Sequence, residues 1–215
     1  MGKKIVFTLL TLIFSIATAN ANLLNDGINA YHKKDYSAAA KDFKIMCGKS
    51  NAYGCYNLGV LYEFGQGVEQ NYSKAAKLYK KACDTGAVSA CYNLGVLYHF
   101  GKGVKQNYNK AFKLYKQSCN GSVLVGCYNM GLLYQSGKGV KQNYNKAARL
   151  FESACNGGIA AGCNNLGVLY NAGKGVRKNK GMAYSYWKKA VKKGDLNAKH
   201  NLYVLCKKTP DVCQP

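Results

Sequence analysis

The sequence concentrates its most reactive residue type in cysteine pairs with a fixed spacing. Ten of the 215 residues are Cys, and eight of these form pairs eight positions apart. An even set of this kind is either a disulfide framework in an oxidising compartment or a set of metal ligands in a reducing one. Zinc ligands usually lie two to four residues apart or include His, and the chain has only three His. We therefore expect disulfides, with no metal and no cofactor, in the pairs Cys47–Cys55, Cys83–Cys91, Cys119–Cys127 and Cys155–Cys163.

The positions where cysteine disappears support this pairing. Successive pairs begin 36 residues apart. At the two positions 36 residues beyond the fourth pair, both Cys are lost together and Val191 and Lys199 stand there instead. Joint loss is expected if the two residues of a pair are partners. Cys206 and Cys213 do not follow this 36-residue recurrence. We predict that they form a fifth disulfide, which pins the C-terminal tail around Pro210.

Other residues that could carry catalysis are sparse. The S-x-x-K motif of serine β-lactamases occurs once, from Ser185 to Lys188, but the accompanying S-D-N and K-T-G motifs are absent. Ten Ser and 29 Lys predict about one such match by chance, so an ordinary helix face explains it better. His32, His99 and His200 lie far apart and outside any H-x-H or H-E-x-x-H context, which favours surface or packing roles. The catalytic residues, if the chain is an enzyme, are unknown from the sequence.

A 36-residue repeat positions these residues. Four segments align without gaps and share the motifs CYNLGVLY, G-x-G-V and N-Y-x-K-A with small variations: Asn51–Gly86, Ala87–Ser122, Val123–Gly158 and Ile159–Gly194. In each segment the apolar residues recur at helical spacing on both sides of the glycine-rich turn, which predicts two helices. Because one hairpin cannot bury both of its faces, the hairpins must stack.

Glycine and aromatic residues recur at fixed places in the predicted helices. Gly59 lies in the middle of the first helix, where glycine is less favourable than Ala by roughly 1 kcal/mol. Its recurrence in every repeat indicates close approach of a neighbouring helix. The second helix carries a bulky residue, Tyr79, replaced later by Tyr115, Phe151 and Trp187, which would pack against these small residues.

The expected organisation is one exported domain. A basic start, a short apolar run and the small residues Ala19 and Ala21 predict a signal peptide over residues 1–21, cleaved near Ala21. No later segment is long and apolar enough to predict a membrane span. Residues 22–215 then form a single repeat domain. Its hairpins are expected at about 23–47, 51–83, 87–119, 123–155 and 159–191, with a C-terminal cap at 195–215.

The pattern N-L-G-x-L-Y, G-x-G-V and K-A resembles the Sel1-like repeat, a relative of the tetratricopeptide repeat. Together with the 36-residue period, the C-x7-C pairs and the predicted signal peptide, it resembles the Helicobacter cysteine-rich protein family. The resemblance implies an all-α, right-handed solenoid of disulfide-linked hairpins that is secreted or periplasmic. It also implies binding of penicillin-type β-lactams, β-lactamase activity or a role in host interaction.

One asparagine per repeat is the candidate binding residue. It lies two positions after the first-helix Cys, about 200° around the helix from it. In tetratricopeptide-type repeats the first helices line a concave groove, so the resemblance places these residues there: Asn57, Asn93, Asn129, Asn165 and Asn201. An amide suits a peptide backbone or a carboxylate. Bonding between adjacent helices is an equally good explanation, and the neighbouring Tyr56, Tyr92 and Tyr128 either add aromatic contacts or pack.

Lysine supplies nearly all of the positive charge. The chain has 31 Lys and Arg against 9 Asp and Glu, a net charge of +22. Lys74, Lys77, Lys80 and Lys81 begin a basic stripe along the second helices. The stripe is either a solvated outer face or a surface attractive to anionic partners. Nucleic acid is not expected, because no recognition motif is present.

The function expected from these patterns is binding. The chain is predicted to be a monomeric, exported scaffold that holds a peptide, a protein or a β-lactam-like ligand in its concave groove. The alternative, hydrolysis of penicillin- or cephalosporin-type β-lactams, is implied by the family resemblance alone, because no catalytic constellation is recognisable in the sequence.

Overall fold

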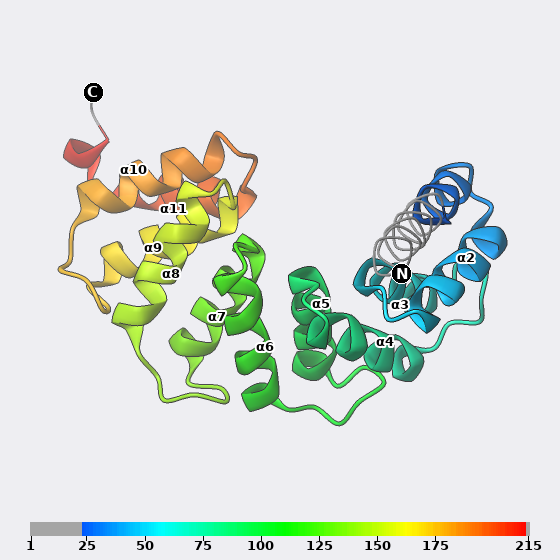
Figure 1. Ribbon diagram of the computed structural model, residues 1–215. Helices are drawn as coiled ribbons and strands as arrows, with labels where there is room; N and C mark the ends of the chain where they lie inside the picture. The colour runs from blue at the N-terminus through cyan, green and yellow to red at the C-terminus, as the bar shows by residue number, and fades with distance from the viewer. Residues whose placement is uncertain (1–22, 214–215) are drawn as a thin grey trace, which may run out of the picture. The chain divides into compact units, whose positions relative to one another are not determined.

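The computed structural model describes residues 23–213, and the expected signal peptide lies outside them. The chain divides into two compact units, residues 1–105 and 106–215 (Figure 1). The boundary falls in the turn after α5 (Val88–Phe100). Each unit has its own packed helices, and the expectation of a single continuous domain over 22–215 stays a prediction.

Both units consist of antiparallel helices joined by short turns. The first contains a helical stretch at 23–32, then α2 (Tyr36–Gly48), α3 (Ala52–Phe64), α4 (Tyr72–Asp84) and α5. The second contains α6 (Tyr108–Asn120), α7 (Leu124–Ser136), α8 (Tyr144–Asn156), α9 (Ala160–Ala172), α10 (Lys180–Val191), α11 (Leu196–Lys208) and the 3₁₀ turn η1 (Pro210–Val212). Within residues 23–213 there is no strand. The all-α, disulfide-linked repeat fold is therefore confirmed.

The second helix of each repeat begins at a capping asparagine. The Asn71 side-chain oxygen accepts a hydrogen bond of 2.8 Å from the backbone N–H of Lys74. A cap of this kind satisfies one of the unpaired N–H groups at a helix start. The same cap recurs at Asn107, Asn143 and Asn179. The repeated Asn of the N-Y-x-K-A motif thus sets where the second helix starts.

The two glycines of the G-x-G-V turn have different tasks. Gly65 ends α3 in the left-handed conformation with φ 68°, which glycine adopts without steric strain. Gly67 lies directly against the backbone of Tyr36, where a Cβ atom would overlap the Tyr36 carbonyl. The first glycine therefore ends the helix, and the second lets the turn dock on the preceding hairpin.

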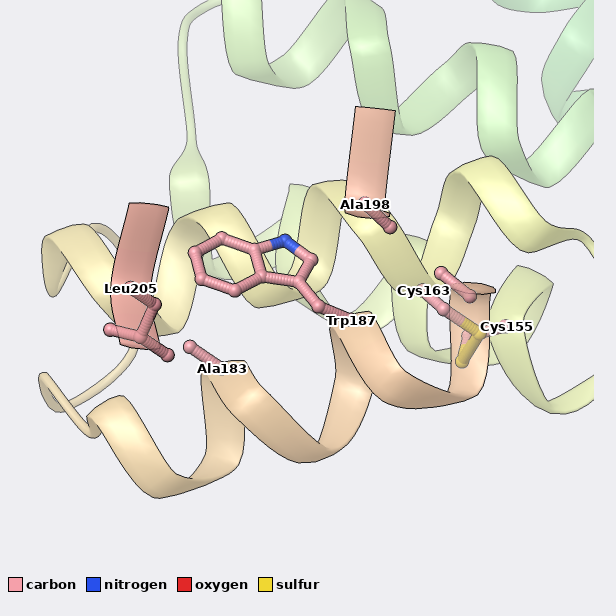
Figure 2. Packing of buried hydrophobic residues seen from close by; sticks show 7 residues of the cluster. Cys155, Cys163, Ala183, Trp187, Ala198 and Leu205 are labelled. Atoms are coloured by element: carbon pink, nitrogen blue, oxygen red, sulfur yellow. A yellow bond between two sulfur atoms is a disulfide. The ribbon is translucent and has the colours of Figure 1, made fainter. Parts of the chain in front are cut away.

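An aromatic ring pressed against a glycine forms the centre of the hairpins at Gly59, Gly131 and Gly167. Tyr79 is fully buried, and a Cβ added to Gly59 would stand 2.7 Å from its ring. Gly131 meets Phe151 and Gly167 meets Trp187 in the same way. Figure 2 shows Trp187 among Ala183, Ala198, Leu205 and the Cys155–Cys163 disulfide. The predicted close approach at the mid-helix glycine is confirmed at these positions.

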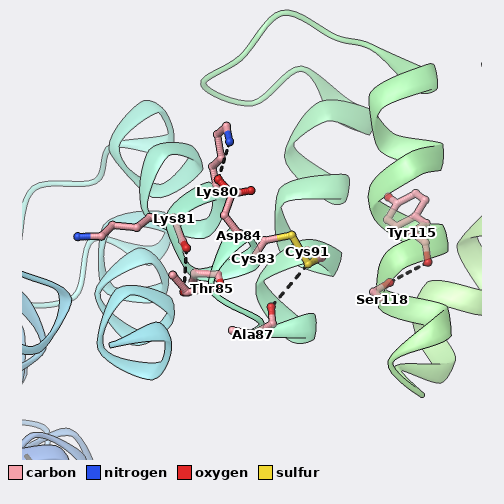
Figure 3. The surroundings of a disulfide bond; sticks show 10 residues. Lys80, Lys81, Cys83, Asp84, Thr85, Ala87, Cys91, Tyr115 and Ser118 are labelled. Carbon is pink, nitrogen blue, oxygen red and sulfur yellow. Dashed lines mark hydrogen bonds and ion pairs between the residues drawn. A yellow bond between two sulfur atoms is a disulfide. The ribbon is translucent and has the colours of Figure 1, made fainter. Parts of the chain in front are cut away.

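Disulfides join each hairpin to the next. The second helix of one hairpin is linked to the first helix of the following one, with Cα–Cα distances of 4.4–4.8 Å, in Cys47–Cys55, Cys83–Cys91, Cys119–Cys127 and Cys155–Cys163. Figure 3 shows Cys83–Cys91 beside the turn that begins at Thr85. Cys206–Cys213 ties η1 to α11. Closing a loop this small contributes about 2–3 kcal/mol per bridge in the chain-entropy model.

Replacing Gly59 with Ala should destabilise the first unit. The new methyl group would overlap the buried Tyr79 ring, and overpacking of this kind typically costs about 1–3 kcal/mol. The free energy of unfolding, measured by urea denaturation without reductant, checks this. Gly48→Ala is the matched control, because nothing lies within 4 Å of the added Cβ. Equal stability of the two variants would show that the ring and the helix can separate at no cost.

Candidate functional site

The candidate site lies on one face of the first helices. Each of these helices carries the repeated Asn and, three residues later, an aliphatic side chain, so the two lie on the same helical face. We call this surface the first-helix face. Its aliphatic members are Val60, Val96, Leu132, Val168 and Val204. The aliphatic residue is part of the repeated sequence motif N-L-G-V, but the prediction from the sequence selected only the asparagine as a binding residue.

In the first unit this face is hollowed by a cavity of about 320 Å³, here the N-terminal cavity. Asn57 and Val60 of α3 line one side, and Ile28 and Tyr31 of the preceding helix line the other. The ring of Phe43 from α2 also lines it. The cavity therefore offers one amide between apolar and aromatic walls.

The second unit has a cavity of about 440 Å³, here the C-terminal cavity. Asn201 and Val204 of α11 line one side, Val168 of α9 lines the other, and Trp187 of α10 also contributes. Each of these residues stands at the same place in its repeat as one residue of the N-terminal cavity. The corresponding residues there are Asn57, Val60, Ile28 and Phe43, in the same order. The two units thus present equivalent cavities built from equivalent positions.

The five predicted asparagines do not have the same surroundings. Asn57 and Asn201 line the cavities. Asn165 donates to the Tyr128 hydroxyl at 3.3 Å, and Asn93 hydrogen-bonds to Tyr56. Asn201 also donates to the Asn164 side-chain oxygen at 2.9 Å. Asn93, Asn165 and Asn201 therefore each bond to the preceding hairpin, and Asn201 lines a cavity as well. Asn129 lies at the corresponding position of α7. A ligand-binding role of these residues stays a prediction.

Burial changes the acidity of the tyrosines that meet these amides. Desolvation raises the pKa of Tyr56, and its hydrogen bond with Asn93 opposes the shift. Tyr128 behaves alike, with a burial-raised pKa opposed by Asn165. Burial also raises the pKa of Tyr79, whose hydroxyl donates to Glu63 at 2.6 Å. These hydroxyls stay protonated at neutral pH and act as structural hydrogen-bonding groups.

The residues considered for catalysis lie apart from one another. Ser185 is exposed on α10, and the Lys188 ammonium lies 5.6 Å from the Tyr184 ring centroid. His32 lines the N-terminal cavity and His200 lines the C-terminal one. Over residues 23–213, no group of three or more His, Cys, Asp or Glu side chains could hold a metal ion. The arrangement is suited to binding through amides and apolar contacts.

The basic stripe separates into different environments. Lys80 pairs with Asp84 at 2.6 Å on the exposed side of α4. Lys74 lies over the Tyr62 ring at 5.1 Å, and Lys81 donates to the Cys47 carbonyl at 2.6 Å. Lysines of the G-K-G-V turns lie over tyrosines of the preceding hairpin, as Lys102–Tyr72, Lys138–Tyr108 and Lys174–Tyr144. Of the predicted stripe, Lys81 therefore serves a contact between hairpins, and the turn lysines add further ones outside the stripe.

This architecture defines a helical-repeat scaffold. The segments 52–86, 88–123, 124–159 and 160–195 each match the family model of the Sel1 repeat. These segments make up more than half of the chain, which belongs to the Sel1 repeat family.

Solved structures share this fold. The protective antigen c5321 of uropathogenic Escherichia coli, which has an SLR fold, is 30% identical with a TM-score of 0.83 over 90% of this chain and 43% of its own. A Sel1 repeat protein from Oxalobacter formigenes is also 30% identical, with a TM-score of 0.77 over 83% of this chain and 73% of its own.

A curated relative shares the cysteine-rich pattern over a short stretch. "Putative beta-lactamase HcpC" of Helicobacter pylori is 46% identical over 48 residues, which are 22% of this chain. The chain spans only 17% of the length of that relative. Together with the Sel1 repeats, this match supports membership of the cysteine-rich branch of the family.

The disulfides indicate where the protein works. Such bridges persist outside the reducing cytoplasm, so five of them indicate an extracytoplasmic protein. Among the described helices, none has the length and apolar character needed to cross a membrane. The predicted signal peptide and the choice between periplasm and secretion stay predictions.

Replacing Asn165 and Asn57 separately with Ala should distinguish a structural amide from a cavity amide. Asn165→Ala removes the bond to Tyr128, which should lower the free energy of unfolding by about 1 kcal/mol. Asn57→Ala should change it by less than about 0.5 kcal/mol, because Leu24 occupies the place of that tyrosine in the preceding helix. Thermal or urea unfolding measures both, and a larger loss for Asn57→Ala would contradict the distinction.

Proposed function

We propose that this protein is an extracytoplasmic scaffold whose first-helix faces bind extended peptide segments of a partner protein. The observation that carries the proposal is the recurrence of one cavity design in both units. Each cavity combines the repeated Asn, the aliphatic residue three positions later and the aromatic residue of the second helix. Within either cavity, an amide between apolar walls suits a short extended peptide segment.

The chemistry of each cavity matches parts of a peptide. The amide of Asn57 or Asn201 can donate to and accept from one backbone peptide group. The apolar walls accept a side chain, because sites of a few hundred Å³ lined by apolar groups are typical ligand sites. The C-terminal cavity is also lined by Lys178, Lys180 and Lys208, which favours acidic residues in the peptide there.

Peptides selected from a displayed random library on the oxidised protein test the proposal. Fluorescence polarisation should show affinity at least tenfold weaker for Asn57→Ala/Val60→Ala or for Asn201→Ala/Val204→Ala, depending on the cavity used. The lost amide bond and apolar contact together should exceed about 1.4 kcal/mol. Asn145→Ala, an exposed position on α8, is the control. Selected peptides that bind both cavity variants with unchanged affinity would refute the proposal.

Hydrolysis of β-lactams is a second candidate, supported by the name of the Helicobacter relative that matches 22% of this chain. The ten cysteines are all in disulfides, so no thiolate is available as a nucleophile. Ser185 lies on an exposed helix face outside both cavities. Binding therefore has the stronger support.

Nitrocefin hydrolysis by highly purified protein decides between these candidates. We expect no turnover above the rate of a matched blank, because Lys188, the base that the S-x-x-K motif would supply, lies over the Tyr184 ring. Ser185→Ala is the diagnostic variant. Turnover in the unmodified protein that disappears in this variant would establish the enzyme and contradict our preference.

A further inference from the structure

A second kind of pocket opens between α2 and α4 of the first unit. It has a volume of about 540 Å³, and its lining includes four lysines: Lys44, Lys74, Lys77 and Lys81. We call it the lysine pocket. Its floor is apolar, formed by Leu58, Tyr62, Leu78 and Cys47. It shares no lining residue with the N-terminal cavity in the same unit.

The floor of the lysine pocket is held by the repeat core. Leu58 is 6% exposed and Cys47 is 5% exposed, and Cys47 is fixed by its disulfide to Cys55. Tyr62 lies on α3 and Leu78 on α4. Leu58 and Cys47 therefore hold the floor in place, and the partly exposed Tyr62 and Leu78 supply the apolar surface that a ligand can reach.

The lysines are arranged as a rim with an excess of positive charge. Lys81 is anchored on the Cys47 carbonyl and Lys74 on the Tyr62 ring. Lys44 and Lys77 are exposed and make no ion pair with another residue of the 23–213 segment. No acidic side chain lines the pocket. Because neighbouring like charges repel one another, an anion bound among these lysines would relieve the repulsion.

The neighbouring Lys80 has a different environment. Figure 3 shows Lys80 and Lys81 leaving α4 on different sides, with Lys80 directed at Asp84. Lys80 is therefore neutralised outside the pocket, whereas Lys81 lies within it. Because Lys80 lies outside the pocket, its substitution can serve as a control for substitution of the pocket lysines on the same helix.

The four-lysine rim is specific to the first unit's pocket. The repeat positions of Lys44, Lys74, Lys77 and Lys81 retain fewer basic residues in every later repeat. Gln117 and Ser153 replace Lys81, and Glu152 replaces Lys44. A solvated outer face needed only for solubility would not require all four cations at one pocket.

We propose that the lysine pocket binds a small organic anion, a carboxylate attached to an apolar body of roughly ten carbon atoms. The carboxylate pairs with the exposed ammonium groups of Lys44 and Lys77, and the apolar body covers the partly exposed Leu78 and Tyr62. The pocket volume falls in the range of roughly 300–1,000 Å³ that is usual for small-ligand sites. This site is independent of the peptide-binding faces.

Titration of the oxidised protein with decanoate, below its aggregation threshold, tests the proposal by calorimetry and by amide NMR shifts. We expect saturable binding, with shifts centred on α2 and α4. Lys44→Gln/Lys77→Gln should weaken it at least tenfold. The matched control is Lys41→Gln/Lys80→Gln, which also removes one charge from α2 and one from α4 but outside the pocket. This control should bind as the unmodified protein does.

The ligand chemistry is tested separately with acetate, which lacks the apolar body, and with the decylammonium cation, which reverses the charge. Both should bind at least tenfold more weakly than decanoate. Circular dichroism verifies that every variant is folded. Absence of saturable decanoate binding, equal weakening in both double variants, or acetate and decanoate binding alike would each overturn the proposal.

Discussion

The contact between an aromatic ring and a mid-helix glycine determines the spacing of the two helices in the hairpins of Gly59, Gly131 and Gly167. Tyr79, Phe151 and Trp187 occupy the space that a side chain at Gly59, Gly131 or Gly167 would need. Because the ring fixes how the helices face each other, it also determines which first-helix residues are left outside the core. The Asn and the aliphatic residue three positions later remain partly exposed for this reason, and the cavities form beside the same rings.

Neighbouring hairpins are held together by a few local contacts at each junction. A disulfide fixes each junction except the last, and the second turn glycine docks on the backbone of the preceding hairpin. In the G-K-G-V turns, the lysine lies over a tyrosine of that hairpin. At the last junction, where Cys is absent, Val191 packs against the Trp187 cluster. Cys206–Cys213 then fastens the end of the chain to α11. A helical repeat with a thin core per hairpin is thereby stabilised without a large interior.

The features that could be predicted from the sequence are those that depend only on residue type and on the period of the repeat. The joint loss of Cys at Val191 and Lys199 indicated the pairing, and the fixed glycine and aromatic positions indicated the packing. The sequence alone did not distinguish side chains that occupy the same position in different repeats but contact different neighbours. Asn165 meets a tyrosine, whereas Leu24 occupies that tyrosine's place before Asn57. The capping role of Asn71 and the opposite directions of Lys80 and Lys81 likewise depend on coordinates that periodicity alone does not supply.

Differences between repeats indicate where function resides in such a scaffold. Positions that hold the hairpin together change little from one repeat to the next, because each must fill the same space. Solvent-facing positions have no such constraint, so a difference among them reflects the surroundings of one particular repeat. The four lysines around Leu58 and Leu78 occur together only in the first unit's pocket. In each of the next two repeats three of the four positions stay basic, and Gln117 or Ser153 takes the fourth. By this reasoning the repeated core accounts for the fold, and the complete set of four lysines distinguishes the lysine pocket from the rest of the basic stripe.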